Sequence, residues 1–170
     1  MKQFRDLKEN LRHEPIKWVE EHNIHITLKF LGETEEQLIP AIGQAVNTVA
    51  LATAPFSLRL NGIGIFGSSY QPRVVWAGID PYEHLSSLMN HVHESLVSVG
   101  FERDRQNLVP HLTLGRIKFL RDKLMFRKTI EQYKEISSTP MVITGMILYE
   151  SILKKEGPEY RILQAHPFNK

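Results

Sequence analysis

The chain contains no cysteine among its 170 residues. Disulfide frameworks, thiolate nucleophiles and zinc–thiolate centres are therefore excluded, and the absence fits a reducing compartment. No apolar run approaches the roughly 18 residues that a membrane-spanning helix needs. The first residues, Met1 to Asp6, lack the apolar core of a signal peptide, so we expect a cytoplasmic protein without a membrane partner.

The chain also has little net charge. Its formal charge is +2, and 42% of its residues are hydrophobic and 24% charged, which is ordinary for a globular protein. So small a charge gives no argument for nucleic-acid binding, and any basic surface must be local. The length suffices to bury a core, and the sequence has no low-complexity linker. We therefore expect a single domain over residues 1–170, with two lobes.

One pattern, His-x-Thr-Leu, occurs twice, at His25–Leu28 and at His111–Leu114. Alternating apolar and polar residues predict a strand around each copy, over residues 23–31 and 109–117. Side chains two positions apart on a strand share a face, so each copy offers one imidazole and one hydroxyl together. If the two strands lie side by side, two histidines and two threonines surround one cleft.

These residue types suit phosphoester cleavage without a metal ion. The reaction needs one group to deprotonate the attacking oxygen and another to protonate the leaving oxygen. Histidine has an unperturbed pKa of about 6.5, so a neutral and a protonated imidazole can coexist near neutrality. Hydroxyls held on a strand can donate to the charged phosphate oxygens. A single copy would more often be an ordinary strand histidine, but the repetition favours His25, Thr27, His111 and Thr113 as catalytic residues.

The remaining pattern mixes helices and strands. Helices are predicted over residues 3–13, 40–49 and 80–100, and over part of 118–134. Strands other than the motif strands are predicted over residues 16–19, 56–60, 73–79, 141–151 and 160–168. Asp80 is expected to cap the third helix, with Pro81 in its first turn. This order predicts an α+β fold of two related halves, with antiparallel sheets and outer helices.

The two motifs lie in longer blocks that resemble the two-histidine (2H) phosphoesterase superfamily. The closest resemblance is to RNA 2′,3′-cyclic phosphodiesterases, long called 2′-5′ RNA ligases, of the LigT or ThpR type. The residues that carry it are Trp18, Asn23–Glu33, Phe66, Arg73–Gly78, Pro110–Arg116, Ser151, Leu153, Gly157 and Tyr160. Together these blocks extend over nearly the whole chain.

The resemblance implies a bilobal, pseudo-symmetric fold in which two antiparallel sheets line a central cleft, with helices outside. It implies metal-independent hydrolysis of RNA 2′,3′-cyclic phosphate ends to 2′-phosphates, with an associated reverse 2′-5′ ligation. One imidazole would activate water and the other would protonate the departing 3′-oxygen. We assign His111 as the base and His25 as the acid.

The resemblance implies no cofactor and no metal. RNA ends or small cyclic-phosphate nucleotides are the expected partners, and the protein is expected to be a monomer. Members of the family usually begin with a short apolar strand, whereas this chain opens on the first predicted helix. We therefore expect that edge strand to be absent or to lie outside the sequence, which removes none of the four motif residues.

Lys29 and Arg116 are candidate substrate-binding residues. Lys29 lies two positions after Thr27 and so shares its face on the predicted strand, although a solvated lysine is an equally good interpretation. Arg116 lies three positions after Thr113, which has the opposite parity unless Gly115 marks a bulge. The family resemblance favours a phosphate contact for Arg116.

For other polar and aromatic residues the sequence gives weaker evidence of a functional role. A metal site at His22 and His25 has weak support, because their spacing suits a helix and they lie in or beside a strand. The other histidines outside the motifs are expected at the surface rather than at a metal ion; these are His13, His84, His91, His93 and His166. Phe66 and Tyr70 could stack on a base, with a core role for Phe66 as the alternative. Basic residues between Lys118 and Lys128 could steer an RNA backbone, although such a run is usually a solvated face.

Two alternatives to the leading function stay open. The same residues could cleave another 2′,5′-linked or cyclic nucleotide, because the pocket loops that select the substrate cannot be interpreted from the sequence. A non-catalytic module that binds RNA ends is the second alternative. It has no need for two titratable imidazoles, so the two intact motifs argue against it.

Overall fold

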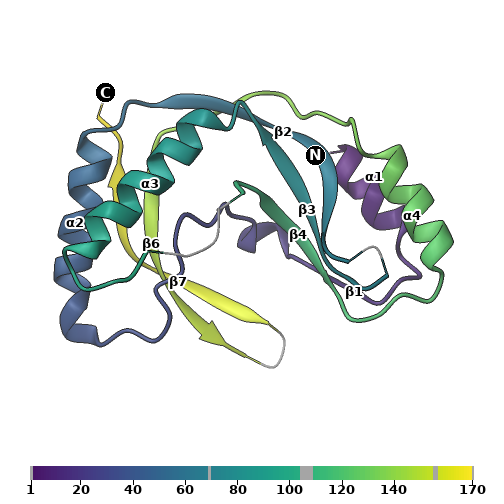
Figure 1. The fold of residues 1–170 in the computed structure, drawn as a ribbon, viewed down its shortest axis with the longest axis horizontal. Coiled ribbons are helices and arrows are strands. Elements are labelled where there is room, and N and C mark those ends of the chain that lie inside the picture. The colour runs from purple at the N-terminus through teal and green to yellow at the C-terminus, as the bar shows by residue number, and fades with distance from the viewer. Residues whose placement is uncertain (1, 69, 104–108, 155–156, 170) are drawn as a thin grey trace. The chain divides into compact units, whose positions relative to one another are not determined.

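The computed structural model describes residues 2–68, 70–103, 109–154 and 157–169 (Figure 1). The chain packs as two compact units, each made of three chain segments. Unit 1 comprises Met1–Ile26, Leu58–Pro81 and His111–Pro140. Unit 2 comprises Thr27–Ser57, Tyr82–Pro110 and Met141–Lys170. The expectation of one two-lobed domain stays a prediction.

The chain has the predicted α+β composition. The helices are α1 (Lys2–Asn10), α2 (Ile39–Leu51), α3 (Glu83–Val97) and α4 (Lys123–Gln132), with short 3-10 helices η1 (Glu21–Asn23) and η2 (Glu36–Leu38). The strands are β1 (Ile16–Trp18), β2 (Phe56–Gly67), β3 (Pro72–Asp80), β4 (Leu112–Ile117), β5 (Met141–Ile143), β6 (Gly145–Leu153) and β7 (Pro158–Pro167). In the part of the chain that the structure describes, no helix is both long and apolar enough to cross a membrane.

Unit 1 is built on an antiparallel sheet. Strands β1, β4, β3 and β2 lie side by side in that order. The first two residues of β2 belong to unit 2, as does β5, the strand next to β2 in the same sheet. Alternate residues of these strands are buried, among them Ile63, Val75, Ala77 and Leu112. This period of two marks one face of the sheet as a core face.

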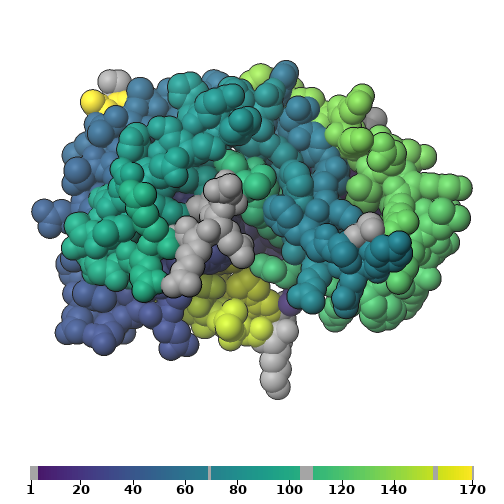
Figure 2. All heavy atoms as spheres, viewed as in Figure 1, coloured from purple at the N-terminus to yellow at the C-terminus, as the bar shows by residue number. Residues whose placement is uncertain are grey.

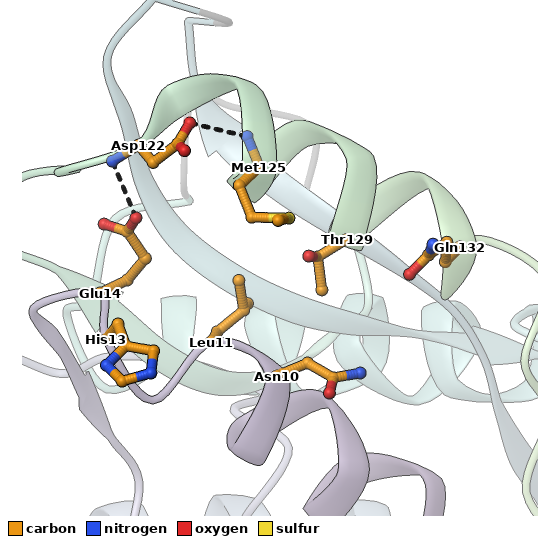
Figure 3. A pocket seen from close by; sticks show the side chains of 8 residues that line it. All are labelled: Asn10, Leu11, His13, Glu14, Asp122, Met125, Thr129 and Gln132. Carbon is orange, nitrogen blue, oxygen red and sulfur yellow. Dashed lines mark hydrogen bonds between the residues drawn. The ribbon is translucent and has the colours of Figure 1, made fainter.

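Helices α1 and α4 complete unit 1 and lie next to each other (Figure 1). The Glu14 carboxylate accepts the backbone N–H groups of Arg121 and Asp122 at 2.7 and 2.9 Å, just before α4 begins. The Asp122 carboxylate caps α4 by accepting the N–H of Met125. A pocket of about 460 Å³ lies between α4 and the C-terminal end of α1 with the residues that follow it (Figure 3). The outer side of α4 is part of the molecular surface (Figure 2).

Unit 2 contains helices α2 and α3, strand β5 and the β6–β7 hairpin. The predicted apolar stripe of α3 is buried, which confirms its amphipathic pattern; it comprises Leu85, Leu88, Met89, Val92 and Leu96. Helix α2 approaches β7 at Gly43. A Cβ atom at this position would collide with the amide end of the Gln164 side chain, which would have to move to another rotamer.

Three predicted elements are wrong in detail. The segment over residues 23–31 is not a regular strand, because it pairs with β4 at one isolated bridge. The predicted strand over residues 141–151 is divided at Thr144, since β5 belongs to the larger sheet and β6 to the hairpin. Asp80 does not cap α3. A cis peptide joins it to Pro81, and its carboxylate instead binds the Arg59 guanidinium at 2.6 and 2.8 Å.

Two histidines expected at the surface are buried instead. His93 lies on the apolar side of α3, and His166 lies in β7 with 5% of its surface exposed. The ring Nδ1 of His166 lies 3.3 Å from the amide oxygen of Asn47, to which it donates when protonated. Burial lowers the pKa of His166, because removal from water disfavours the charged imidazolium.

This burial predicts a loss of stability in acid. The folded protein binds fewer protons at His166 than the unfolded chain, so its stability falls as the pH falls from about 6.5 towards the lowered folded pKa. We expect the thermal midpoint to fall further between about pH 7.5 and about pH 5.5 in the wild type than in His166→Gln. The matched control is His91→Gln, at an exposed position, which should behave as the wild type. Equal falls in the wild type and H166Q would contradict the prediction.

Candidate active site

The second motif lies on a strand that is paired along both edges. Strand β4 pairs with β1 on one side and with β3 on the other. His111 immediately precedes β4, and Thr113 is its second residue. Leu112 and Leu114 are buried, whereas His111 and Thr113 are only partly so. Pairing with β3 at Leu112 and Thr113 therefore limits the rotation of this part of β4 and fixes the face on which Thr113 lies.

The first motif reaches the same strand by a different route. After β1, the N–H of Val19 donates to the Leu114 carbonyl at 2.8 Å, and the chain then turns through η1. It returns to β4 where Ile26 forms an antiparallel bridge with Leu112. In an antiparallel pair, the residue before one partner lies opposite the residue after the other. His25 of the first motif therefore lies opposite Thr113 of the second.

The His25 ring is oriented by its own chain. Its Nδ1 lies 2.7 Å from the carbonyl oxygen of Asn23, at the end of η1. A carbonyl can only accept, so Nδ1 carries a proton in this hydrogen bond. Thr27 follows Ile26 and is the first residue of unit 2, so its place in one cleft with the other motif residues stays a prediction.

Two aromatic rings surround His111. Phe66 and Trp76 stack with centroids 5.1 Å apart, and the imidazole packs edge-on to Phe66 at 4.7 Å and at 6.3 Å from Trp76. Trp76 lies opposite Thr113 on β4 and opposite Gly64 on β2. The contacts of Phe66 favour its packing role over an exposed stacking surface. Tyr70 is exposed, with the Arg127 guanidinium 5.7 Å from its ring.

A bulge in β4 decides the face on which Arg116 lies. Val75 pairs with Gly115, but the next residue, Trp76, pairs with Thr113, so β4 contains one extra residue between them. Arg116 lies opposite Val74. Because Val74 and Trp76 share a face, Arg116 shares the face of Thr113. The bulge that this placement required is therefore present.

Lys29 lies in a different setting from the one predicted. It belongs to unit 2, where its ammonium donates to the Glu102 carbonyl at 3.0 Å. Since residues 23–31 are not a regular strand, the alternation that placed Lys29 beside Thr27 does not apply. A phosphate contact for Lys29 stays a prediction.

His93 was missed as a residue that contacts a motif segment. Its Nε2 lies 3.0 Å from the carbonyl oxygen of Leu28, the residue after Thr27. The sequence did contain a signal, because His93 lies four positions after Met89 and three before Leu96 on the buried stripe of α3. Within the described ranges, no three His, Asp or Glu side chains gather closely enough to hold a metal ion.

Known proteins are similar to this chain in sequence and in fold. The RNA 2′,3′-cyclic phosphodiesterase of Methanocaldococcus jannaschii is 34% identical, over 92% of this chain and 87% of its own. That of Archaeoglobus fulgidus is 36% identical, over 88% and 82%. The crystal structure of the protein TT0787 of Thermus thermophilus superposes with a TM-score of 0.80 at 25% identity, covering 98% of this chain and 90% of that one.

A further fold likeness is to Escherichia coli LigT complexed with 3′-AMP, with a TM-score of 0.68 at 23% identity over 97% of this chain and 92% of that one. The model of the family described as LigT-like phosphoesterase matches residues 1–76 and 79–160. These matches confirm the resemblance inferred from the two His-x-Thr blocks. The chain belongs to the LigT-like phosphoesterase family.

Proposed function

We propose that this protein is a phosphodiesterase that opens RNA 2′,3′-cyclic phosphate ends to 2′-phosphates. Family membership supports the phosphoesterase chemistry, and relatives that match most of the chain bear the name RNA 2′,3′-cyclic phosphodiesterase. The observation that carries the proposal is the antiparallel register at Ile26 and Leu112. In this register His25 and Thr113 are the backbone positions opposite each other, which supports their action on one phosphate.

The proposed reaction uses each motif residue once. His111 removes a proton from water as the water oxygen attacks phosphorus, and His25 Nε2 donates a proton to the 3′-oxygen as the P–O3′ bond breaks. The products are a 2′-phosphate and a 3′-hydroxyl, and proton exchange with solvent restores both imidazoles. Thr27 and Thr113 donate to the non-bridging oxygens, whose charge grows in the transition state.

Arg116 is proposed to attract the phosphate. It is exposed and shares a face with Thr113, and a guanidinium can form two parallel hydrogen bonds to phosphate oxygens. The reverse 2′-5′ ligation, action on another cyclic nucleotide and RNA-end binding without turnover stay predictions. The cytoplasmic location, the monomeric state and the phosphate contact of Lys29 also stay predictions.

The decisive experiment incubates the protein, in EDTA, with a short RNA that ends in 2′,3′-cyclic phosphate and identifies the terminal phosphate. We expect a 2′-phosphate. His25→Ala and His111→Ala should each lower turnover by about 10²–10⁴-fold, because each removes one proton-transfer group. Their thermal midpoints should match the wild type, since neither ring is fully buried.

His13→Ala, at an exposed position outside the motifs, is the matched control and should retain full activity. Retained activity in either motif variant would contradict the assignment of that histidine as a proton-transfer group. Loss of wild-type activity in EDTA would point to a metal-dependent reaction. Tight binding of the RNA end without turnover would favour the binding module.

Thr113→Val tests the hydroxyl opposite His25. Valine has nearly the same shape, so the strand should be retained while the hydrogen-bond donor is lost. We expect kcat to fall by about 10²-fold with KM nearly unchanged, as for removal of a donor that acts on developing charge. Thr139→Val, at an exposed position, is the control. A rise in KM alone would instead assign Thr113 to ground-state binding.

Arg116→Gln tests the proposed phosphate contact. We expect KM for the cyclic-phosphate RNA to rise about tenfold with kcat little changed, because the lost charge acts on the phosphate in both the bound and transition states. The rise should shrink at high salt, where exposed charges are screened. Arg121→Gln is the control, since only the backbone of Arg121 is engaged by Glu14. An unchanged KM in R116Q would contradict the assignment.

A further inference from the structure

The first motif has weak backbone support compared with the second. Strand β4 is paired on both edges, whereas the segment that carries His25 and Thr27 pairs with it at the isolated bridge of Ile26 with Leu112. A single bridge leaves the next residues able to shift. Proton transfer tolerates little displacement, because a misplacement of about 1 Å can cost about 10²-fold in rate. The segment therefore needs a second point of attachment.

His93 supplies such a point in unit 2. Its Nε2 lies 3.0 Å from the carbonyl oxygen of Leu28, one residue beyond Thr27. It projects from the middle of α3, a helix of 15 residues whose stripe is buried against the interior. The donor is thus fixed by a rigid element. Lys29 makes a comparable bond to the Glu102 carbonyl, but its long side chain has more freedom to move.

The choice of histidine at this position has a physical reason. His93 is 8% exposed and occupies a place on the stripe where an apolar residue would be buried without loss of hydration. Burial of an imidazole is offset when it donates a hydrogen bond. The Nε2–H is present in one of the two neutral tautomers and in the imidazolium, and either form can donate to the Leu28 carbonyl.

We propose that His93 is a positioning residue that fixes the Leu28 carbonyl and, through it, the backbone of the first His-x-Thr motif. The role in catalysis rests on the proposed function, whereas the anchoring of the segment does not. His93 belongs to neither motif and acts through the backbone. By holding the Leu28 carbonyl, it limits the movement of the adjacent backbone, from which the side chains of the motif project.

The test compares two amides that differ in reach. In His93→Gln the side-chain amide can occupy the place of Nε2–H, whereas in His93→Asn it falls short, near the position of Nδ1. Hydrogen exchange of the amides of residues 26–30 measures the anchoring without any substrate. We expect faster exchange there in H93N and wild-type exchange in H93Q. His91→Asn, at an exposed position on the same helix, is the control.

The kinetic test uses the same variants and the cyclic-phosphate RNA. We expect kcat to fall about tenfold or more in H93N with KM nearly unchanged, and H93Q to retain most of kcat. Wild-type exchange and kcat in H93N would overturn the proposal, as would equal losses in the two variants. If the wild type turns over no cyclic phosphate, the proposed function fails, and the exchange comparison still decides the anchoring.

A measurement on the wild type covers the case in which H93N does not fold. Ring ¹⁵N shifts distinguish the two neutral tautomers of histidine. The proposed bond requires a proton on His93 Nε2, because the Leu28 carbonyl can only accept. The Nε2–H tautomer or the imidazolium would support the proposal. A neutral ring protonated only at Nδ1 would overturn it.

Discussion

The candidate site depends on the antiparallel bridge between Ile26 and Leu112. Side chains alternate along extended backbone, so a shift of one residue in this register would turn His25 to the opposite face from Thr113. The chain reaches the bridge after Val19, which follows β1 and donates to the Leu114 carbonyl of β4, and after the turn of η1. The conformation of the segment from Val19 to Ile26 therefore determines which residues of the two motifs lie opposite each other.

Strand β4 supplies the rigid half of this arrangement. Pairing with β3 at Leu112 and Thr113 holds the motif part of β4, and the buried side chains of Leu112 and Leu114 anchor the strand in the core of unit 1. Its bulge adds one residue between Thr113 and Gly115, which reverses the parity of the later strand residues and brings Arg116 to the same face. A local irregularity thus gathers an imidazole, a hydroxyl and a guanidinium on one surface.

The first motif is held by different interactions. A carbonyl at Asn23 orients the His25 ring, one bridge joins Ile26 to β4, and His93 binds the carbonyl of Leu28. These are single contacts from separate elements rather than a continuous ladder. Such a segment is more sensitive to the loss of one side chain than a strand within a continuous ladder.

The sequence by itself determined the family, the α+β class, the two His-x-Thr pairs and the buried stripe of α3, because these depend on residue identity and on local periodicity. Only the tertiary structure decided that residues 23–31 meet β4 at one bridge, that Asp80 binds Arg59 instead of capping α3, and that His93 and His166 are buried. Partners in these contacts come from distant chain segments. Sequence periodicity records which side chains share a face, but not which remote backbone group lies opposite that face.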